Sequence, residues 1–271
     1  MGNLQVVAVR SCKEFEEEYL NLVGKIMGKP AIPVGLLPPD QQPKEREGTD
    51  GSWNQIFKWL DEQKPRSVVL VGFGTECKLK IYEIAYRLEL SELPFFWALR
   101  KPSWAIDDQD ALPLSFSHRT SGKGVVHIGW APQMDILAHP SVGGSLFHSG
   151  WGSVTETLQY GHCFVGLPFI VDQGLNARLL EEKSLATEVP RSEGGAFNRD
   201  GVAKSLRQAM ISEEEQPLRE RTGEVAGIFS GRKLRDNYVD GPMCSFVVAY
   251  FLSNLLLELC LWMEMESLNY Y

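Results

Sequence analysis

Residues 144–156 combine a short apolar run, a turn of small residues and polar side chains that suit a phosphate-bearing ligand. The run at 144–148 has the composition of a buried parallel strand and ends in His148, and residues 149–153 are rich in Gly and Ser. A helix is predicted from about 154 to 160. Free backbone N–H groups and the positive end of a helix dipole therefore meet at the turn, which predicts a phosphate site.

Two side chains near this turn each allow two interpretations. Ser153 could cap the helix through its oxygen or donate its hydroxyl to a phosphate, and we weigh the two equally. Glu156 lies one turn into the helix, where a carboxylate would accept hydrogen bonds from a ribose diol. The same Glu is also spaced as the capping-box partner of Ser153, three residues earlier. The sequence leaves both pairs of alternatives open.

Alternating strands and helices must position this turn. Strands are predicted at 67–73, 95–99, 125–128, 144–148 and 185–189, and helices at 52–63, 79–89, 154–160, 175–183, 199–210 and 214–229. This alternation is typical of an α/β fold with a Rossmann-like, doubly wound parallel sheet, in which ligands bind beyond the carboxyl ends of the strands. A further strand at 4–9 and a helix at 13–26 precede a proline-rich passage.

The composition of the chain argues against several classes of binding partner. The chain has 271 residues and a net charge of −8, which argues against nucleic acid and acidic membrane surfaces as partners. Its five cysteines include no CxxC pair, and with the five histidines they make no metal-ligand spacing. An aspartate-rich run at 107–110 is typical of a solvated loop. We therefore expect free thiols, a cytoplasmic location and no metal or other cofactor.

The stretch 130–173 resembles the donor-binding signature of plant UDP-sugar-dependent glycosyltransferases of the family 1 type. The resemblance implies the C-terminal half of a GT-B type fold, with a UDP-sugar as co-substrate rather than cofactor. Its anchors stand in register: Trp130, Ala131, Pro132, Gln133, His148, Gly150, Trp151, Ser153, Glu156, Pro168, Asp172 and Gln173.

The resemblance also implies a role for each anchor. Trp130 would stack on uracil while the Ala131 backbone bonds its edge, and Gln133 with Glu156 would hold the ribose hydroxyls. His148, Ser153 and the backbone around Trp151 and Gly152 would bind the diphosphate. Asp172 and Gln173 would bind the sugar, and Thr75 would contact either the phosphates or the sugar.

Two positions depart from the commonest pattern. Gly152 stands where most members have Asn, and Ser149 where many have Cys. The missing amide removes one phosphate donor, worth about 1 kcal/mol or somewhat more, unless the glycine lets the backbone approach more closely. The pair resembles a branch that extends a sugar already attached to a glycoside, and Gln173 resembles glucose users.

The domain organisation is predicted in four parts. Residues 1–28 resemble the remnant of an N-terminal acceptor domain, 29–51 an interdomain linker, and 52–240 the donor-binding domain. Residues 241–271 form an atypical apolar tail that leaves the family pattern and could reflect an altered gene end. Its run 243–263 is long enough to span a membrane, but Asn254 and Glu258 would be costly in lipid, so packing on protein is favoured.

Three functions remain open. The first is the donor half of a glycosyltransferase acting on a small-molecule acceptor such as a flavonoid or terpenoid glycoside. In the resembled family the catalytic base is a histidine of the N-terminal domain, so we assign no catalytic residue here and expect weak or no transfer by the isolated chain. The second is a non-catalytic UDP-sugar-binding protein. The third, a dinucleotide oxidoreductase, is disfavoured because the third glycine after Gly72 and Gly74 would fall at Cys77.

Overall fold

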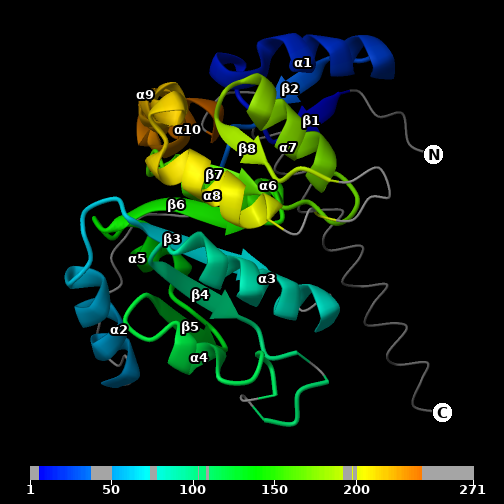
Figure 1. Cartoon of the computed structure of the whole chain (residues 1–271). Coiled ribbons are helices and arrows are strands. Elements are labelled where there is room, and N and C mark those ends of the chain that lie inside the picture. Colours follow the sequence, from blue (N-terminus) through cyan, green and yellow to red (C-terminus); the bar gives the residue numbers. More distant parts are fainter. Residues whose placement is uncertain are drawn as a thin grey trace, which may run out of the picture. The chain divides into compact units, whose positions relative to one another are not determined.

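The computed structural model describes residues 6–37, 51–73, 78–102, 104–107, 110–191, 197 and 200–239, which divide into two units (Figure 1). The described part of the first unit is residues 6–37 and 231–239. It contains β1 (Val7–Val9), α1 (Lys13–Met27), β2 (Ala31–Pro33) and α10 (Arg232–Val239). Within it the Tyr238 hydroxyl accepts from the backbone N–H of Lys13 at 2.9 Å and donates to Glu14 Oε2 at 2.8 Å.

One element of this unit differs from its prediction. The strand predicted at 4–9 and the helix at 13–26 are present, but the passage predicted as a linker contains β2, which pairs with β1 in parallel. The pairing continues past the strand, where Val34 N–H donates to the Val9 carbonyl at 2.9 Å. Prolines weaken a local strand signal, whereas the partner strand is distant in sequence. The predicted domain boundaries stay predictions.

The second unit is built on a six-stranded sheet. Its strands are β3 (Val68–Phe73), β4 (Phe95–Leu99), β5 (Gly124–Ile128), β6 (Val142–Phe147), β7 (Cys163–Gly166) and β8 (Ala186–Glu188). They lie in the order β5-β4-β3-β6-β7-β8, and every neighbouring pair is parallel. The order reverses between β3 and β6, which is the topological switch point of a doubly wound sheet. The predicted fold class is confirmed.

Helices cover both faces of this sheet. They are α2 (Gly51–Asp61), α3 (Lys78–Ser91), α4 (Phe116–Arg119), α5 (Gln133–Leu137), α6 (Trp151–Leu158), α7 (Gln173–Glu182), α8 (Gly201–Ile211), the 3₁₀ turn η1 (Glu213–Glu215) and α9 (Gln216–Ser230). α3 packs against α8, and α6 packs against α9 (Figure 1). Because parallel crossovers are right-handed, reversing the strand order puts α3 and α6 on opposite faces. β7, α4 and α5 were not predicted from the sequence.

The core explains why the strands read as continuous apolar runs. All six residues of β3 are buried, as are Phe95, Phe96 and Trp97 in β4. A parallel sheet covered on both faces needs apolar side chains at successive positions, not at alternate ones. α2 instead buries one stripe, made of Trp53, Ile56, Phe57 and Leu60. The carboxyl ends of the strands are thereby held beside each other.

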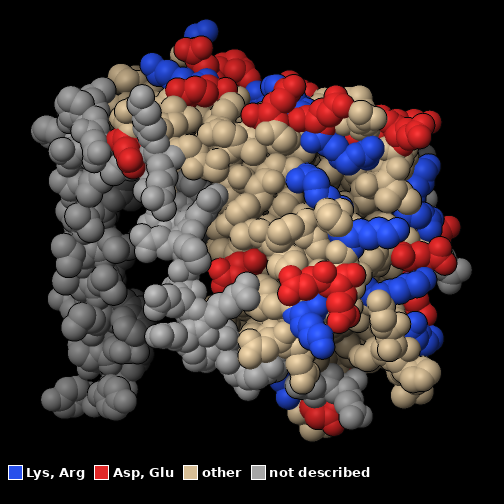
Figure 2. All heavy atoms as spheres, turned by 90° about the vertical axis from the view of Figure 1, so that its left-hand side faces the viewer, with Lys and Arg blue, Asp and Glu red and all other residues tan. Residues whose placement is uncertain are grey.

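The described part of the chain has a face of mixed charge and two buried cysteines. Figure 2 shows a face on which Lys and Arg side chains lie among Asp and Glu side chains. Cys12 and Cys163 are buried free thiols. Across the described ranges, no helix has the length and apolarity needed to cross a bilayer, and no three His, Cys, Asp or Glu side chains cluster as metal ligands. The apolar tail at 241–271 lies outside these ranges.

Candidate functional site

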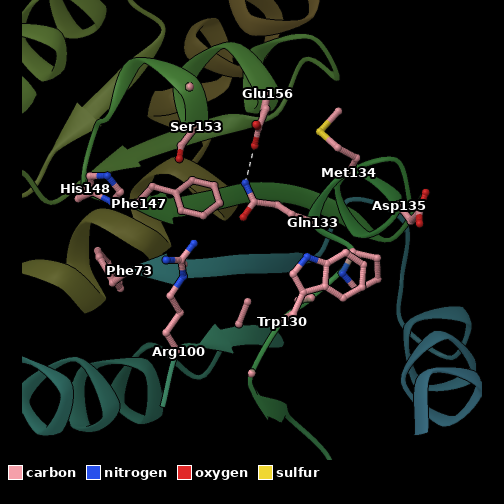
Figure 3. Close-up of a pocket in the computed structure, with 16 residues that line it drawn as sticks. Phe73, Arg100, Trp130, Gln133, Met134, Asp135, Phe147, His148, Ser153 and Glu156 are labelled. Carbon is pink, nitrogen blue, oxygen red and sulfur yellow. Dashed lines mark hydrogen bonds between the residues drawn. The ribbon is translucent and has the colours of Figure 1, made fainter. Parts of the chain in front are cut away.

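An open cavity of about 730 Å³ lies at the carboxyl ends of the central strands (Figure 3). Phe73 ends β3 and Phe147 ends β6, while His148 directly follows β6 and Arg100 directly follows β4. The cavity therefore occupies the crevice at the switch point between β3 and β6, where doubly wound sheets bind their ligands. Its described lining comprises Gly72, Phe73, Ala98, Arg100, Gly129, Trp130, Ala131, Pro132, Gln133, Met134, Asp135, Phe147, His148, Gly152, Ser153 and Glu156.

Trp130 presents an aromatic surface at one end of the cavity. It follows β5 after Gly129, whose φ of +131° a residue with a side chain rarely adopts. The indole is 75% exposed. The rings of Trp53 and Trp130 form a T-shaped pair, with centroids 6.5 Å apart and an interplanar angle of 79°. The exposed indole keeps aromatic surface available in the cavity, which suits stacking on a nucleobase.

The backbone next to this indole is held by a histidine. His127 Nε2 lies 2.9 Å from the Trp130 carbonyl oxygen. Because a carbonyl only accepts, Nε2 carries the hydrogen. The His127 ring also lies 4.4 Å from the Trp53 ring, centroid to centroid. Strand β5 and helix α2 thus fix the exposed tryptophan together.

Gln133 and Glu156 come together from two different helices. Gln133 begins α5, and its Nε2 donates to Glu156 Oε2 at 2.6 Å (Figure 3). Glu156 projects from α6, and both side chains line the cavity. A carboxylate acceptor beside an amide offers complementary groups to a vicinal diol, because the amide oxygen also accepts. This is the pairing that the sequence interpretation assigned to the ribose.

The beginning of α6 corrects the predicted helix start. The helix begins at Trp151 with Gly150 as its N-cap, and no side chain caps it. Ser153 is therefore the third helical residue, which contradicts the alternative that it is the N-cap and the capping-box interpretation of Glu156. Because the turn is rich in small residues, the sequence predicted the start of this helix three residues too late. Ser153 instead lines the cavity, as do His148 and Gly152.

The turn itself depends on a close approach. A Cβ at Gly150 would lie 2.8 Å from His148 Nε2, so a side chain there would force the imidazole to shift. Ser149 between them has φ +65°. Figure 3 shows His148 and Ser153 at the opposite end of the cavity from Trp130. The cavity therefore has an aromatic end and an end with a helix N-terminus.

Three of the described residues that were predicted for the site do not line the cavity, and a fourth predicted residue is not described. Thr75 falls outside the described residues, and Trp151, Asp172 and Gln173 do not line the cavity. Gln173 Oε1 accepts from the backbone N–H groups of Phe169 at 2.8 Å and Ile170 at 3.1 Å. Asp172 Oδ2 accepts from Asn176 Nδ2 at 3.1 Å. The Asp172 carboxylate and the Gln173 carbonyl thus each have a partner within the loop and helix that carry them.

Charge is distributed unevenly along the cavity. Asp135 lies at the Trp130 end, whereas the Arg100 guanidinium lies toward Phe73 and Phe147 (Figure 3). Burial raises the pKa of the nearby Tyr160, and the carboxylates of Asp135 and Glu156 raise it further. Sequence reasoning did not select Arg100. A polar residue directly after a buried strand was the available signal, since such positions border the ligand crevice.

Comparison with known proteins agrees with this geometry. Residues 59–214, more than half of the chain, match the family described as UDP-glucoronosyl and UDP-glucosyl transferase. The chain is 44% identical over 237 residues to soyasaponin III rhamnosyltransferase of Glycine max, covering 85% of this chain and 50% of that protein. It is 43% identical over 241 residues to UDP-glycosyltransferase 91A1 of Arabidopsis thaliana, covering 87% and 51%.

Solved structures show the same architecture. A transferase from Siraitia grosvenorii in complex with UDP matches with a TM-score of 0.69 and 27% identity, covering 93% of this chain and 60% of that one. A UDP-glucosyltransferase from Polygonum tinctorium capable of glucosylating indoxyl gives a TM-score of 0.72 and 28% identity, covering 87% and 52%. The chain spans about half the length of the curated relatives that it matches. By its matched domain, its parallel sheet and its relatives, this chain belongs to the plant UDP-glycosyltransferases of family 1.

Proposed function

We propose that this chain carries the UDP-sugar site of a glycosyltransferase that moves a hexose, glucose by preference, to a hydroxyl of a small plant metabolite or its glycoside. The observation that carries the proposal is the convergence of Trp130, the Gln133–Glu156 pair, His148 and Ser153 on one cavity. These residues follow β5 and β6 or belong to α5 and α6, so only the folded sheet assembles them. Membership of the family supports the same assignment.

In the proposed mode, the nucleotide lies along the cavity from its aromatic end to the N-terminus of α6. Uracil stacks on Trp130 and bonds the Ala131 backbone, and the ribose hydroxyls bond Glu156 and Gln133. The diphosphate then reaches His148, Ser153 and the first N–H groups of α6, where the helix dipole favours negative charge. Thr75, Asp172 and Gln173 remain proposed contacts of the phosphates and the sugar.

The proposed contribution to catalysis is stabilisation of the leaving group. In transfer, a bond forms between the acceptor oxygen and the anomeric carbon, while the bond from that carbon to the diphosphate oxygen breaks. Negative charge then grows on UDP, and oriented donors at the start of α6 stabilise it more in the transition state than in the ground state. No residue of this chain is assigned as the base that removes the acceptor's proton.

Calorimetric titration with UDP, uridine and NAD tests the nucleotide site. We expect UDP and uridine to bind and NAD not to. Replacing Trp130 by Ala removes one base stack, worth about 1–3 kcal/mol, and should weaken both UDP and uridine by about 5- to 150-fold. Since the indole is 75% exposed, the fold should survive. Tyr86→Ala, at an exposed aromatic on α3, is the matched control.

Unchanged UDP binding by Trp130→Ala would remove the uracil stack from the proposal.

A panel of UDP-glucose, UDP-galactose and UDP-rhamnose then tests which sugar is preferred, because the Glycine max relative is named for rhamnosyl transfer. Equal affinity for all three would refute the glucose preference. Binding without transfer to a flavonoid or terpenoid glycoside would favour the second candidate, a non-catalytic UDP-sugar-binding chain.

A further inference from the structure

Arg100 lines the cavity without a role in the scheme above. It directly follows β4, its side chain is exposed, and Figure 3 shows the guanidinium pointing into the cavity toward Phe147 and Ser153. Among the described residues, it is the only Lys or Arg in the cavity lining. Arg100 thus lies at the carboxyl end of β4, which is the neighbour of β3, and β3 borders the switch point.

The guanidinium of Arg100 also differs from others in its bonding. Arg66 donates to the Gly161 carbonyl at 2.6 Å, and Arg219 donates to the Ala209 and Ser212 carbonyls at 3.1 and 2.7 Å. For Arg100, no ion pair or hydrogen bond of the guanidinium with another described residue is present. An arginine carries five N–H donors and keeps its charge at any ordinary pH. An exposed cation that is directed into a cavity and has no bonding partner among the described residues is therefore available to an anionic ligand.

The end of the cavity that Arg100 faces lacks one donor. Gly152 supplies no side chain there, whereas the resembled signature most often has Asn at this position. A Cβ built on Gly152 would meet nothing within 4 Å, so open space lies beside the second residue of α6. Ser153 and His148 remain as side-chain donors, and neither is a fixed cation. A diphosphate carries at least two negative charges, and this protein has a net charge of −8.

We propose that Arg100 binds the diphosphate of the UDP-sugar, donating charge-assisted hydrogen bonds where Gly152 leaves no amide. The assignment rests on the proposed function, since it names a further residue of the same site. Arg forms short, bidentate bonds to phosphate oxygens, which are stronger than bonds from a neutral amide. Arg100 would also stabilise the charge that grows on UDP as the sugar leaves.

Titration with fragments of the UDP-sugar separates the proposed role of Arg100 from that of Trp130. Calorimetry with uridine, UDP and UDP-glucose compares the wild type with Arg100→Gln, Arg100→Lys and Lys123→Gln. Lys123 is an exposed cation in the turn before β5, so its variant makes the same charge change elsewhere. We expect Arg100→Gln to weaken UDP and UDP-glucose by about 10- to 100-fold. Arg100→Lys should lie between, and uridine should bind all four proteins equally.

A second variant tests the link to Gly152. Because a side chain fits at this position, Gly152→Asn in the Arg100→Gln background should recover part of the lost UDP affinity, about threefold or more. The dependence of UDP affinity on salt should also become shallower in Arg100→Gln than in Lys123→Gln, because one fewer cation faces the phosphates. Thermal unfolding checks that each variant is folded.

Several results would overturn the assignment. UDP affinity unchanged in Arg100→Gln would refute it, as would an equal loss for uridine, which would point to a structural role. A loss confined to UDP-glucose, with UDP itself unaffected, would place the guanidinium at the sugar instead. These outcomes leave the nucleotide site intact, whereas a wild type that binds neither uridine nor UDP would refute the proposed function itself.

Discussion

Acid sensitivity should be concentrated at His162, a buried histidine between α6 and β7. Its side chain is 4% exposed, and its Nε2 lies 2.6 Å from the Leu137 carbonyl oxygen. Since that oxygen only accepts, Nε2 carries the hydrogen, and protonation must occur at Nδ1. Nδ1 is buried and has no hydrogen-bond partner among the described residues. Burial lowers the His162 pKa from 6.5 to about 4, and the Arg66 charge acts in the same direction.

The sign of the pH dependence follows from proton counting. Between the unfolded pKa of 6.5 and the native pKa of about 4, the unfolded chain binds a proton that the native chain does not. The free energy of unfolding therefore falls as pH falls through this window and is unaffected by His162 above about pH 7. His162 lowers the free energy of unfolding by roughly 2 kcal/mol at pH 5 and by roughly 3 kcal/mol at pH 4.

His162→Gln isolates this contribution. The Gln amide keeps a donor for the Leu137 carbonyl but does not titrate. Urea unfolding at about pH 7.5 and about pH 5 should show the wild type losing roughly 2 kcal/mol more than the variant. His118→Gln, at an exposed histidine in α4, should follow the wild type. If the wild type and His162→Gln lost stability in parallel, the buried neutral histidine would not be the acid-sensitive group.

Two further predictions concern the packing that supports the site. Ser149 is fully buried and its hydroxyl has no hydrogen-bond partner within the described chain, so Ser149→Ala should raise the free energy of unfolding by about 1 kcal/mol. The φ of +65° at residue 149 is the same in the wild type and in Ser149→Ala, so it does not affect the comparison. A loss of stability in denaturant titration would indicate that the hydroxyl has a partner. Gly143→Ala would put a Cβ 2.2 Å from the Arg66 carbonyl oxygen and should cost about 1–3 kcal/mol or more. Gly152→Ala, with open space around it, should leave the melting temperature nearly unchanged, and equal effects of the two substitutions would contradict this packing argument.

Much of the sheet and several side chains of the cavity could be predicted without the structure. β3, β4 and β6 are continuous apolar runs because both faces of a parallel sheet are covered, and such runs are visible locally. Trp130, Gln133, His148, Ser153 and Glu156 belong to one contiguous signature. His148, Ser153 and Glu156 lie together because a strand, a turn and a helix that are adjacent in sequence are also adjacent in space, whereas the sheet brings Trp130 and Gln133 to them.

Other features were decided only by tertiary structure. β2 exists through its pairing with β1, and the short helices α4 and α5 have too few residues for a periodic signal. Helix α6 begins at Trp151, so Ser153 faces the cavity instead of capping the helix. Whether a polar residue is a cap or a ligand depends on a boundary that composition locates only within a few residues.

The sequence by itself determined the alternation of the main strands and helices and the family signature, and it predicted the side chains that border the turn before α6. The tertiary structure decided which distant residues join them. Arg100 lies thirty positions before Trp130, yet both line one cavity, because the sheet places β4 between β3 and β5. Gln173 belongs to the signature, but its carbonyl binds the backbone of the loop before α7. Local pattern specifies each element, whereas strand order and loop packing are set by contacts far apart along the chain.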